Sequence, residues 1–177
     1  MLKYYSRLKH FGYKAYGLKI HSEIELPELI PYSEKKPDVW IRIGHVPENI
    51  HYITGSGISY QASWNDFLFK LDSIAKFRVQ HGNSITVEIS DKTSLKEIRL
   101  VLLGSCIGAI IHQRGILALH GSTVAKDNKG ITFIGKSSSG KSTIALGLAE
   151  KGYLVISDDI SVIDLKVSNK NIVYPGI

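Results

Sequence analysis

The feature that most constrains this chain is the segment Gly135-Lys-Ser-Ser-Ser-Gly-Lys-Ser142, which matches the pattern GxxxxGK[ST] in full. An apolar run, 131–134, precedes it. An amphipathic helix is expected after it to about Lys151, with Gly152 as the helix C-cap. A strand that ends in a glycine-rich turn and enters a helix is the setting in which this pattern binds phosphate. The sequence therefore predicts a phosphate-binding loop between a strand and a helix.

Each part of the motif has a physical role. The glycines let the backbone turn tightly, so that its N–H groups face the phosphates, and the helix beginning near Lys141 directs its N-terminal dipole at the same anion. Lys141 supplies a positive charge to the β- and γ-phosphates, and Ser142 offers a hydroxyl to Mg²⁺. The sequence thus predicts ATP and Mg²⁺ as cofactors, with GTP or pyrophosphate as the alternative phosphate donors because no base-reading motif is visible. The residues expected to contact the nucleotide are Gly135, Lys136, Ser137, Ser138, Ser139, Gly140, Lys141, Ser142 and Thr143.

A pair of acidic residues, Asp158-Asp159, follows the next apolar run, 154–157. A βαβ crossover returns the chain parallel to its first strand. If strands 131–134 and 154–157 are neighbours, both carboxylates emerge at the edge that holds the phosphates. One carboxylate can then orient the metal while the other accepts the proton of an attacking hydroxyl. The alternative is a turn that uses aspartate as an ordinary loop residue.

His120 ends a short apolar strand, 116–120, that precedes the strand leading into the loop. This position makes it a candidate for the same edge, where it could tune an acid or touch the transferred phosphate. The alternative is a packed histidine without a chemical role.

The first ninety residues favour β-structure, with strands expected at 16–26, 38–43 and 66–71 and a hairpin of 74–80 with 84–90. Ser94 and Glu97 then form a capping-box pattern before a helix that runs to about His112 and lies buried between layers. We therefore expect residues 1–90 to be a β-rich region for peptide or partner recognition and 91–177 to be a P-loop kinase domain. A strand begins at 172–174 just before the sequence stops, so we expect a further C-terminal portion.

Composition narrows the class of protein. The 177 residues are 44% hydrophobic and 21% charged, which allows a buried core. The net charge of +6 is scattered, so it favours a phosphate or acidic ligand and predicts no nucleic-acid partner. The most apolar stretch, 98–111, is shorter than the roughly 20 residues that span a membrane. Cys106 is the single cysteine and is expected to be a buried thiol, so we expect a reducing, cytoplasmic setting.

Three elements in order resemble the catalytic domain of HPr kinase/phosphorylase: His120, then Gly135–Ser142, then Gly152-Tyr-Leu-Val-Ile-Ser-Asp-Asp159. The spacings between them agree with that family, and the resemblance covers about residues 115–165. It implies an α/β fold whose P-loop βαβ core has a mixed sheet, as in HPr kinase and PEP carboxykinase, here preceded by a small β-rich region.

The resemblance also implies roles. Asp158 would be the general base for a serine hydroxyl, His120 would assist near the phosphate, and Asp159 would support the metal or Lys141. Lys141 and Ser142 would keep the roles that their chemistry suggests. The family's downstream glutamate and basic loop cannot be located in these 177 residues, so phosphorylase activity stays open.

The N-terminal region looks like the front of shorter HPr-kinase-like proteins, some of which resemble kinases for the C-terminal serine of lasso peptide precursors. The leading expectation is a Mg-ATP-dependent serine kinase for a small protein or peptide, in a family that tends to form homo-oligomers. Two alternatives are a small-molecule kinase with the same loop and a nucleotide-binding interaction module without transfer chemistry.

Overall fold

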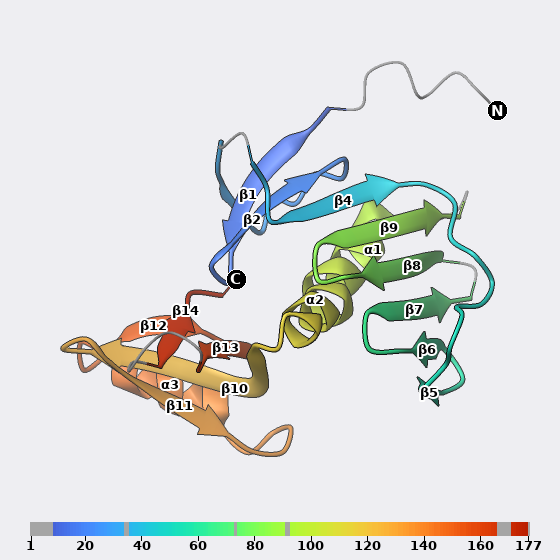
Figure 1. The fold of residues 1–177 in the computed structure, drawn as a ribbon. Helices are drawn as coiled ribbons and strands as arrows, with labels where there is room; N and C mark the ends of the chain where they lie inside the picture. The colour runs from blue at the N-terminus through green and yellow to red at the C-terminus, as the bar shows by residue number, and fades with distance from the viewer. Residues whose placement is uncertain (1–8, 34–35, 73, 91–92, 166–170, 177) are drawn as a thin grey trace. The chain divides into compact units, whose positions relative to one another are not determined.

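The computed structural model describes residues 9–33, 36–72, 74–90, 93–165 and 171–176, and the chain divides into two compact units (Figure 1). The first unit contains the described residues up to Lys14 together with Leu18–Arg114. The second contains Ala15–Gly17 and the chain from Gly115 onward. We expected a boundary near Ser90, whereas the contacts place the division at Gly115. The reason is that the helical segment before Gly115 packs on the sheet of the first unit.

The first unit is built on a nine-stranded sheet of order β3-β1-β2-β4-β9-β8-β7-β6-β5. β2 pairs with β4, and β4 with β9, in parallel, while β5 to β9 pair as antiparallel neighbours, so the sheet is mixed. The strands are β1 (Phe11–Ala15), β2 (Leu18–Ser22), β3 (Ile30–Pro31), β4 (Val39–Ile43), β5 (Gly55–Ser56), β6 (Tyr60–Ala62), β7 (Asp66–Leu71), β8 (Ala75–Gln80) and β9 (Ser84–Ile89).

The predicted hairpin of β8 and β9 is confirmed, with His81 and Gly82 at φ 51° and 63° in its turn. The strand predicted over 16–26 is confirmed only in its middle, as β2 (Leu18–Ser22), and is shorter at both ends. A turn at Tyr16–Gly17, with φ 53° and 74°, separates β1 from β2. The alternating pattern gave no sign of this turn. Positive φ is costly for tyrosine, so a turn of this kind is not expected at Tyr16.

The expected helix after residue 90 is present, but it is not α-helical along its whole length. α1 (Leu95–Val101) starts with the predicted Ser94–Glu97 capping box, passes through a π-helical segment, η1 (Leu102–Cys106), and continues as α2 (Ile107–Gln113). Figure 1 shows these helices behind β8 and β9. Cys106 is fully buried there, as predicted, and burial raises the pKa of its thiol.

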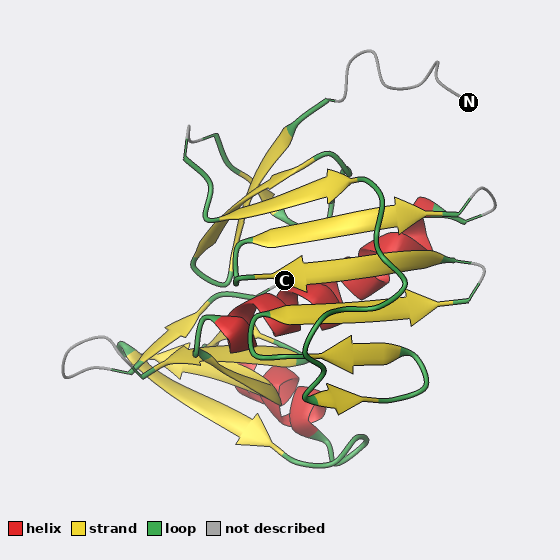
Figure 2. Cartoon of the chain, turned by 45° about the vertical axis from the view of Figure 1, so that its right-hand side comes forward, coloured by secondary structure: helices red, strands yellow, loops and turns green. Residues whose placement is uncertain are grey.

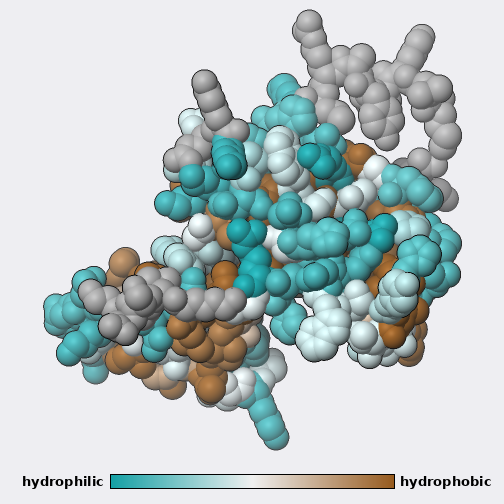
Figure 3. All heavy atoms as spheres, viewed as in Figure 1, coloured by the Kyte–Doolittle hydropathy of each residue, from teal (hydrophilic) through white to brown (hydrophobic). Residues whose placement is uncertain are grey.

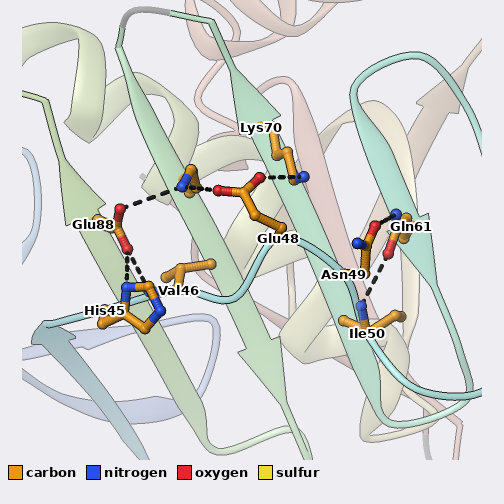
Figure 4. Close-up of polar contacts among 9 residues, drawn as sticks. His45, Val46, Glu48, Asn49, Ile50, Gln61, Lys70 and Glu88 are labelled. Atoms are coloured by element: carbon orange, nitrogen blue, oxygen red, sulfur yellow. Dashed lines mark hydrogen bonds and ion pairs between the residues drawn. The ribbon is translucent and has the colours of Figure 1, made fainter.

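A long connection from β4 to β5 crosses the sheet on the face opposite the helices (Figure 2). Figure 4 shows how side chains of successive strands hold it. Glu88 of β9 accepts the Val46 amide at 2.6 Å, and Gln61 of β6 accepts the Ile50 amide at 3.0 Å. Between them, Glu48 forms ion pairs with Lys70 of β7 and Lys76 of β8. Val46 and Ile50 of this connection are buried together with Leu68 of β7.

The second unit contains a five-stranded sheet of order β11-β10-β13-β14, in which β12 also pairs with β10. Every pairing described in this sheet is antiparallel. We expected a mixed sheet around the glycine-rich loop, but the mixed sheet of this chain is the one in the first unit. The short strand expected over 116–120 is part of a longer strand, β10, which runs on past Gly121. The elements are β10 (Leu117–Lys126), β11 (Lys129–Ile134), α3 (Lys141–Ala149), β12 (Leu154–Ser157), β13 (Ile160–Asp164) and β14 (Ile172–Tyr174).

Strands β11 and β12 are not neighbours, because β10 lies between them and pairs antiparallel with both. β11 and β12 therefore run parallel to each other with one strand, β10, between them. Helix α3 connects them along the chain. The described protein is an α/β chain dominated by strands, with few helices.

Helix α3 is not the amphipathic helix that we expected. Only Lys141 and Ala145 are buried on it, whereas Ile144 and Leu146 are 47% and 65% exposed. Figure 3 shows apolar side chains gathered on the surface of the second unit, where the exposed large residues include Ile131, Ile134, Ile144, Leu146, Leu154 and Val155. Since apolar residues lie on several sides of the helix, the sequence pattern does not indicate which side is covered.

Candidate active site

The site is organised around Gly121 in the middle of β10. On one side Gly121 pairs with Ile134, the last residue of β11 before the glycine-rich loop. On the other side its amide donates to the Asp159 carbonyl at 3.2 Å. The start of the loop and the acidic pair therefore lie at the same level of the sheet, on opposite sides of β10. The sequence placed the acidic pair at this edge on the condition that strands 131–134 and 154–157 were neighbours. They are not, and the loop and the acidic pair reach the same level across β10 instead.

The glycine-rich loop leads directly from β11 into α3. Gly140 is the N-cap residue at φ 87°, and no side chain caps the helix. Ser138 also has positive φ, at 62°. The Lys141 ammonium donates to the carbonyls of Gly135 and Lys136 at 3.2 and 3.0 Å. The lysine thus curls back over its own loop, beside a helix N-terminus whose first N–H groups have no side-chain cap.

Asp158 lies where β12 ends, and its carboxylate is held by two hydroxyls. Ser142 Oγ donates to Oδ1 at 3.0 Å, and Ser122 Oγ donates to the same oxygen. The Ser122 hydrogen bond contributes most to lowering the pKa of Asp158, and partial burial opposes it. Ser142, the Asp159 backbone amide and the charge of Lys141 lower this pKa further. Asp158 is therefore a carboxylate held in its ionised form.

Asp159 occupies a different position from Asp158. It has φ 75° and is 86% exposed, and it lies beside His120, whose Nδ1 is 3.1 Å from the Asp159 carbonyl and 3.5 Å from Oδ1. The structure thus brings Asp158 to Ser142 and Asp159 to His120. Among the described contacts, neither the Ser142 hydroxyl nor the Lys141 ammonium reaches the Asp159 side chain, although we expected Asp159 to support the metal or Lys141.

Sequence reasoning missed Ser122, which is fully buried. A signal was available, since Ser122 follows His120 by two residues on a strand and therefore shares its face. It also missed four hydroxyls on neighbouring strands that bond to one another. Thr123 bonds to Thr132 and Ser161 at 2.8 Å each, and Ser161 bonds to Ser157 at 3.0 Å and to the Gly121 carbonyl at 2.9 Å.

Tyr16 also belongs to the second unit, although it lies far from the motifs in sequence. Its amide donates to the Pro175 carbonyl at 2.9 Å. A Cβ placed on Gly176 would lie 3.1 Å from the Tyr16 ring and 3.0 Å from Ser157 Cβ, so the ring packs beside the end of β12. Burial, with a smaller effect from the charge of Asp159, raises the pKa of Tyr16 to about 12.

Within the described residues, no group of three or more His, Cys, Asp or Glu side chains is arranged to hold a metal ion. No helix in that part of the chain is long and apolar enough to cross a membrane. Mg²⁺ commonly binds through one or two protein ligands together with the phosphates of a nucleotide. The Ser142 hydroxyl, which lies beside the Asp158 carboxylate, is a protein ligand of that kind.

Two known proteins match parts of this chain. The HPr kinase/phosphorylase of Chlorobium phaeovibrioides is 49% identical over 47 residues, which cover 27% of this chain and 14% of that protein. The HPr kinase/phosphorylase of Chlorobium phaeobacteroides is 40% identical over 57 residues, which cover 32% of this chain and 16% of that protein. The chain therefore spans only about a sixth or less of the relatives that it matches. No family model and no solved structure matches it. These short matches support a likeness to HPr-kinase-like proteins and nothing finer.

Proposed function

We propose that the second unit is the nucleotide-binding part of a Mg-ATP-dependent serine kinase of the HPr-kinase-like type. The observation that carries the proposal is the 3.0 Å hydrogen bond from Ser142 to Asp158. It joins the end of the glycine-rich loop to the end of β12, so that a hydroxyl suited to Mg²⁺ and a carboxylate suited to proton transfer face one another. The partial matches to two HPr kinase/phosphorylases support the same direction.

The residues present fit a triphosphate. The loop contributes a glycine at φ 87°, an uncapped helix N-terminus and the buried Lys141 ammonium, all of which favour an anion. Bound ATP would supply the phosphoryl group, and Mg²⁺ would neutralise part of its charge. Residues 135–143 would hold the phosphates, with Ser142 facing the metal. The described residues do not indicate which base the nucleotide carries.

In this proposal Asp158 holds and orients the acceptor hydroxyl and accepts its proton. A carboxylate with a lowered pKa stays ionised at neutral pH, so it is available as an acceptor of hydrogen bonds and protons. His120, fixed against Asp159, would contact the transferred phosphate from the other side of the acidic pair. Asp159 would support the metal only if its exposed side chain turns toward Ser142.

The proposed acceptor is a serine on a small protein or peptide, such as a lasso peptide precursor. The net charge of +6 suits an acidic or carboxylate-terminated acceptor. The first unit, with its wide mixed sheet, is proposed to recognise that acceptor, and the protein is proposed to act in the cytoplasm.

The test is incubation with Mg-ATP and candidate serine peptides, with phosphate transfer read by mass spectrometry. Asp158→Asn should lose transfer and retain ATP binding, because the amide keeps the shape of the carboxylate but cannot accept the proton. Asp164→Asn, one strand further on, is the matched control and should retain both. Normal transfer by Asp158→Asn would show that the base is assigned wrongly.

Two results would redirect the proposal. Phosphorylation of a small molecule but of no peptide would favour a small-molecule kinase. Tight binding of Mg-ATP without transfer to any acceptor would favour a nucleotide-binding interaction module.

A further inference from the structure

The Asp158 carboxylate is held by two hydroxyls whose surroundings differ. Ser142 lies in the first turn of α3 and is exposed, whereas Ser122 lies in the middle of β10 and is fully buried. β10 pairs with β11 on one side at Ser122, opposite Phe133, and with β12 on the other side from Thr123 onward. Ser122 is thus held in the sheet by its pairing with β11, whereas Ser142 lies at an exposed helix start.

Both hydroxyls donate to the same atom, Asp158 Oδ1. A serine hydroxyl has a single proton to donate, and one that binds a metal ion does so through its oxygen. That oxygen can bind Mg²⁺ while the proton still points at Asp158, so the hydrogen bond is lost only when the rotation of Ser142 toward the metal carries Oγ away from Oδ1. In that rotamer of Ser142, the side-chain donor that remains on Asp158 among the described residues is Ser122.

We propose that Ser122 is a positioning residue, which fixes the Asp158 carboxylate when Ser142 is engaged by the metal. The inference rests on the proposed function for its catalytic meaning, although the positioning itself can be tested without turnover. Removal of the Ser122 hydroxyl then leaves the carboxylate with the Asp159 backbone amide as its described hydrogen-bond donor, so its side-chain torsion is held less firmly. Because proton transfer depends on a narrow range of distances and angles, turnover should fall while nucleotide binding persists.

The neighbouring residue, Thr123, provides a matched control. Its hydroxyl is equally buried on the same strand but bonds to Ser161 and Thr132 rather than to Asp158. Thr123→Val and Ser122→Ala each delete one buried hydroxyl. A purely structural role for Ser122 predicts similar effects of the two substitutions, whereas a positioning role predicts an effect on Asp158 for Ser122→Ala alone.

The first experiment measures the χ1 rotamers of Asp158 by NMR three-bond couplings in a Ser142→Ala background, without nucleotide. With Ser122 present, Asp158 should keep one dominant rotamer, and Thr123→Val should not change this. Adding Ser122→Ala should give averaged couplings, while thermal melting checks that each variant is folded. A single Asp158 rotamer in the folded double variant would overturn the inference, whatever the activity of the protein.

The second experiment measures phosphate release from Mg-ATP, with water as the acceptor, and Mg-ATP binding by a fluorescent analogue. Ser122→Ala should lower kcat by about 10- to 100-fold, as expected for a misplaced proton acceptor, and change KM less than about threefold. Ser122→Thr, which keeps the hydroxyl, should recover most of kcat. Equal kcat for Ser122→Ala and the wild type would overturn the inference but leave the kinase proposal intact. Failure of the wild type to bind Mg-ATP would instead overturn the proposed function.

Discussion

The Ser142 hydroxyl donates a 3.0 Å hydrogen bond to Asp158 across a separation of 16 residues in the chain. The two residues belong to different elements, the first turn of α3 and the end of β12, and the helix between them returns the chain to the level at which it left β11. This relationship brings the glycine-rich loop and the acidic pair together. Asp159, in contrast, lies beside His120.

Lys141 should be essential for nucleotide binding. Its ammonium lies on the loop carbonyls of Gly135 and Lys136, where a triphosphate would offer a stronger, charged partner. Lys141→Ala should weaken Mg-ATP binding by about 10- to 100-fold, since hydrogen bonds to charged groups contribute roughly 1.5–3 kcal/mol. Titration calorimetry measures this. Lys151→Ala, an exposed charge just beyond α3, is the control, and an equal loss of affinity there would refute a specific role for Lys141.

Two glycines of the same region should respond to alanine with opposite signs. Apart from the adjacent backbone, a Cβ at either Gly140 or Gly147 meets no atom within 4 Å, so a clash with the rest of the protein plays no part. Gly140 has φ 87°, which should cost an alanine about 1–2 kcal/mol of unfolding free energy. Gly147 lies inside α3, where alanine should add about 0.5–1 kcal/mol. Denaturant unfolding compares the two variants, and a shift of the same sign in both would contradict this account of the loop.

Tyr16 should make stability depend on alkaline pH. Its pKa is raised from 10.0 to about 12, so folding favours the neutral phenol. The stabilisation from this group is complete below pH 10 and is lost as the pH rises through the folded pKa. Tyr16→Phe should therefore flatten the fall in unfolding free energy above pH 10. Tyr52→Phe, at a side chain that is 91% exposed, should leave the wild-type curve unchanged.

The ion pairs of Glu48 should stabilise the first unit in a manner that depends on acid and salt. Hydrogen bonds from Lys76 and Lys70 lower the pKa of Glu48 from 4.5 to about 2. The stabilisation is present above pH 4.5 and is lost as the pH falls toward 2, so the wild type and Glu48→Gln should converge there. Added salt should also reduce their difference, because the pairs are largely exposed.

The control is Glu150→Gln, because in the described part of the chain Glu150 has no ion pair. The difference in unfolding free energy between the wild type and Glu150→Gln should depend neither on acid pH nor on salt. Chemical denaturation at several pH values and salt concentrations measures all three proteins. A difference between the wild type and Glu48→Gln that persists unchanged at pH 2 would mean that the ion pairs are not its source.

Local features of the fold were predictable from the sequence because they depend on residues a few positions apart. The capping box of Ser94 and Glu97, the β8–β9 turn at His81–Gly82 and the loop before α3 each depend on local backbone geometry and nearby hydrogen bonds. The π-helical segment and the break at Tyr16–Gly17 were not predictable in the same way. Apolar periodicity carries no signal for an added residue in a helical turn or for positive φ at a tyrosine.

By itself, the sequence determined the parts of the candidate site: a phosphate-loop pattern, an acidic pair after an apolar strand, and a histidine that ends an earlier one. Only the tertiary structure decided their arrangement. In the folded chain, β10 lies between β11 and β12. Asp158 contacts Ser142, and Asp159 contacts His120. Ser122, 36 residues before Asp158 in the chain, donates a hydrogen bond to it. The physical reason is that strand register is set by pairing and burial across the whole sheet. Residues that are adjacent in sequence, such as Asp158 and Asp159, can therefore acquire different neighbours and different roles.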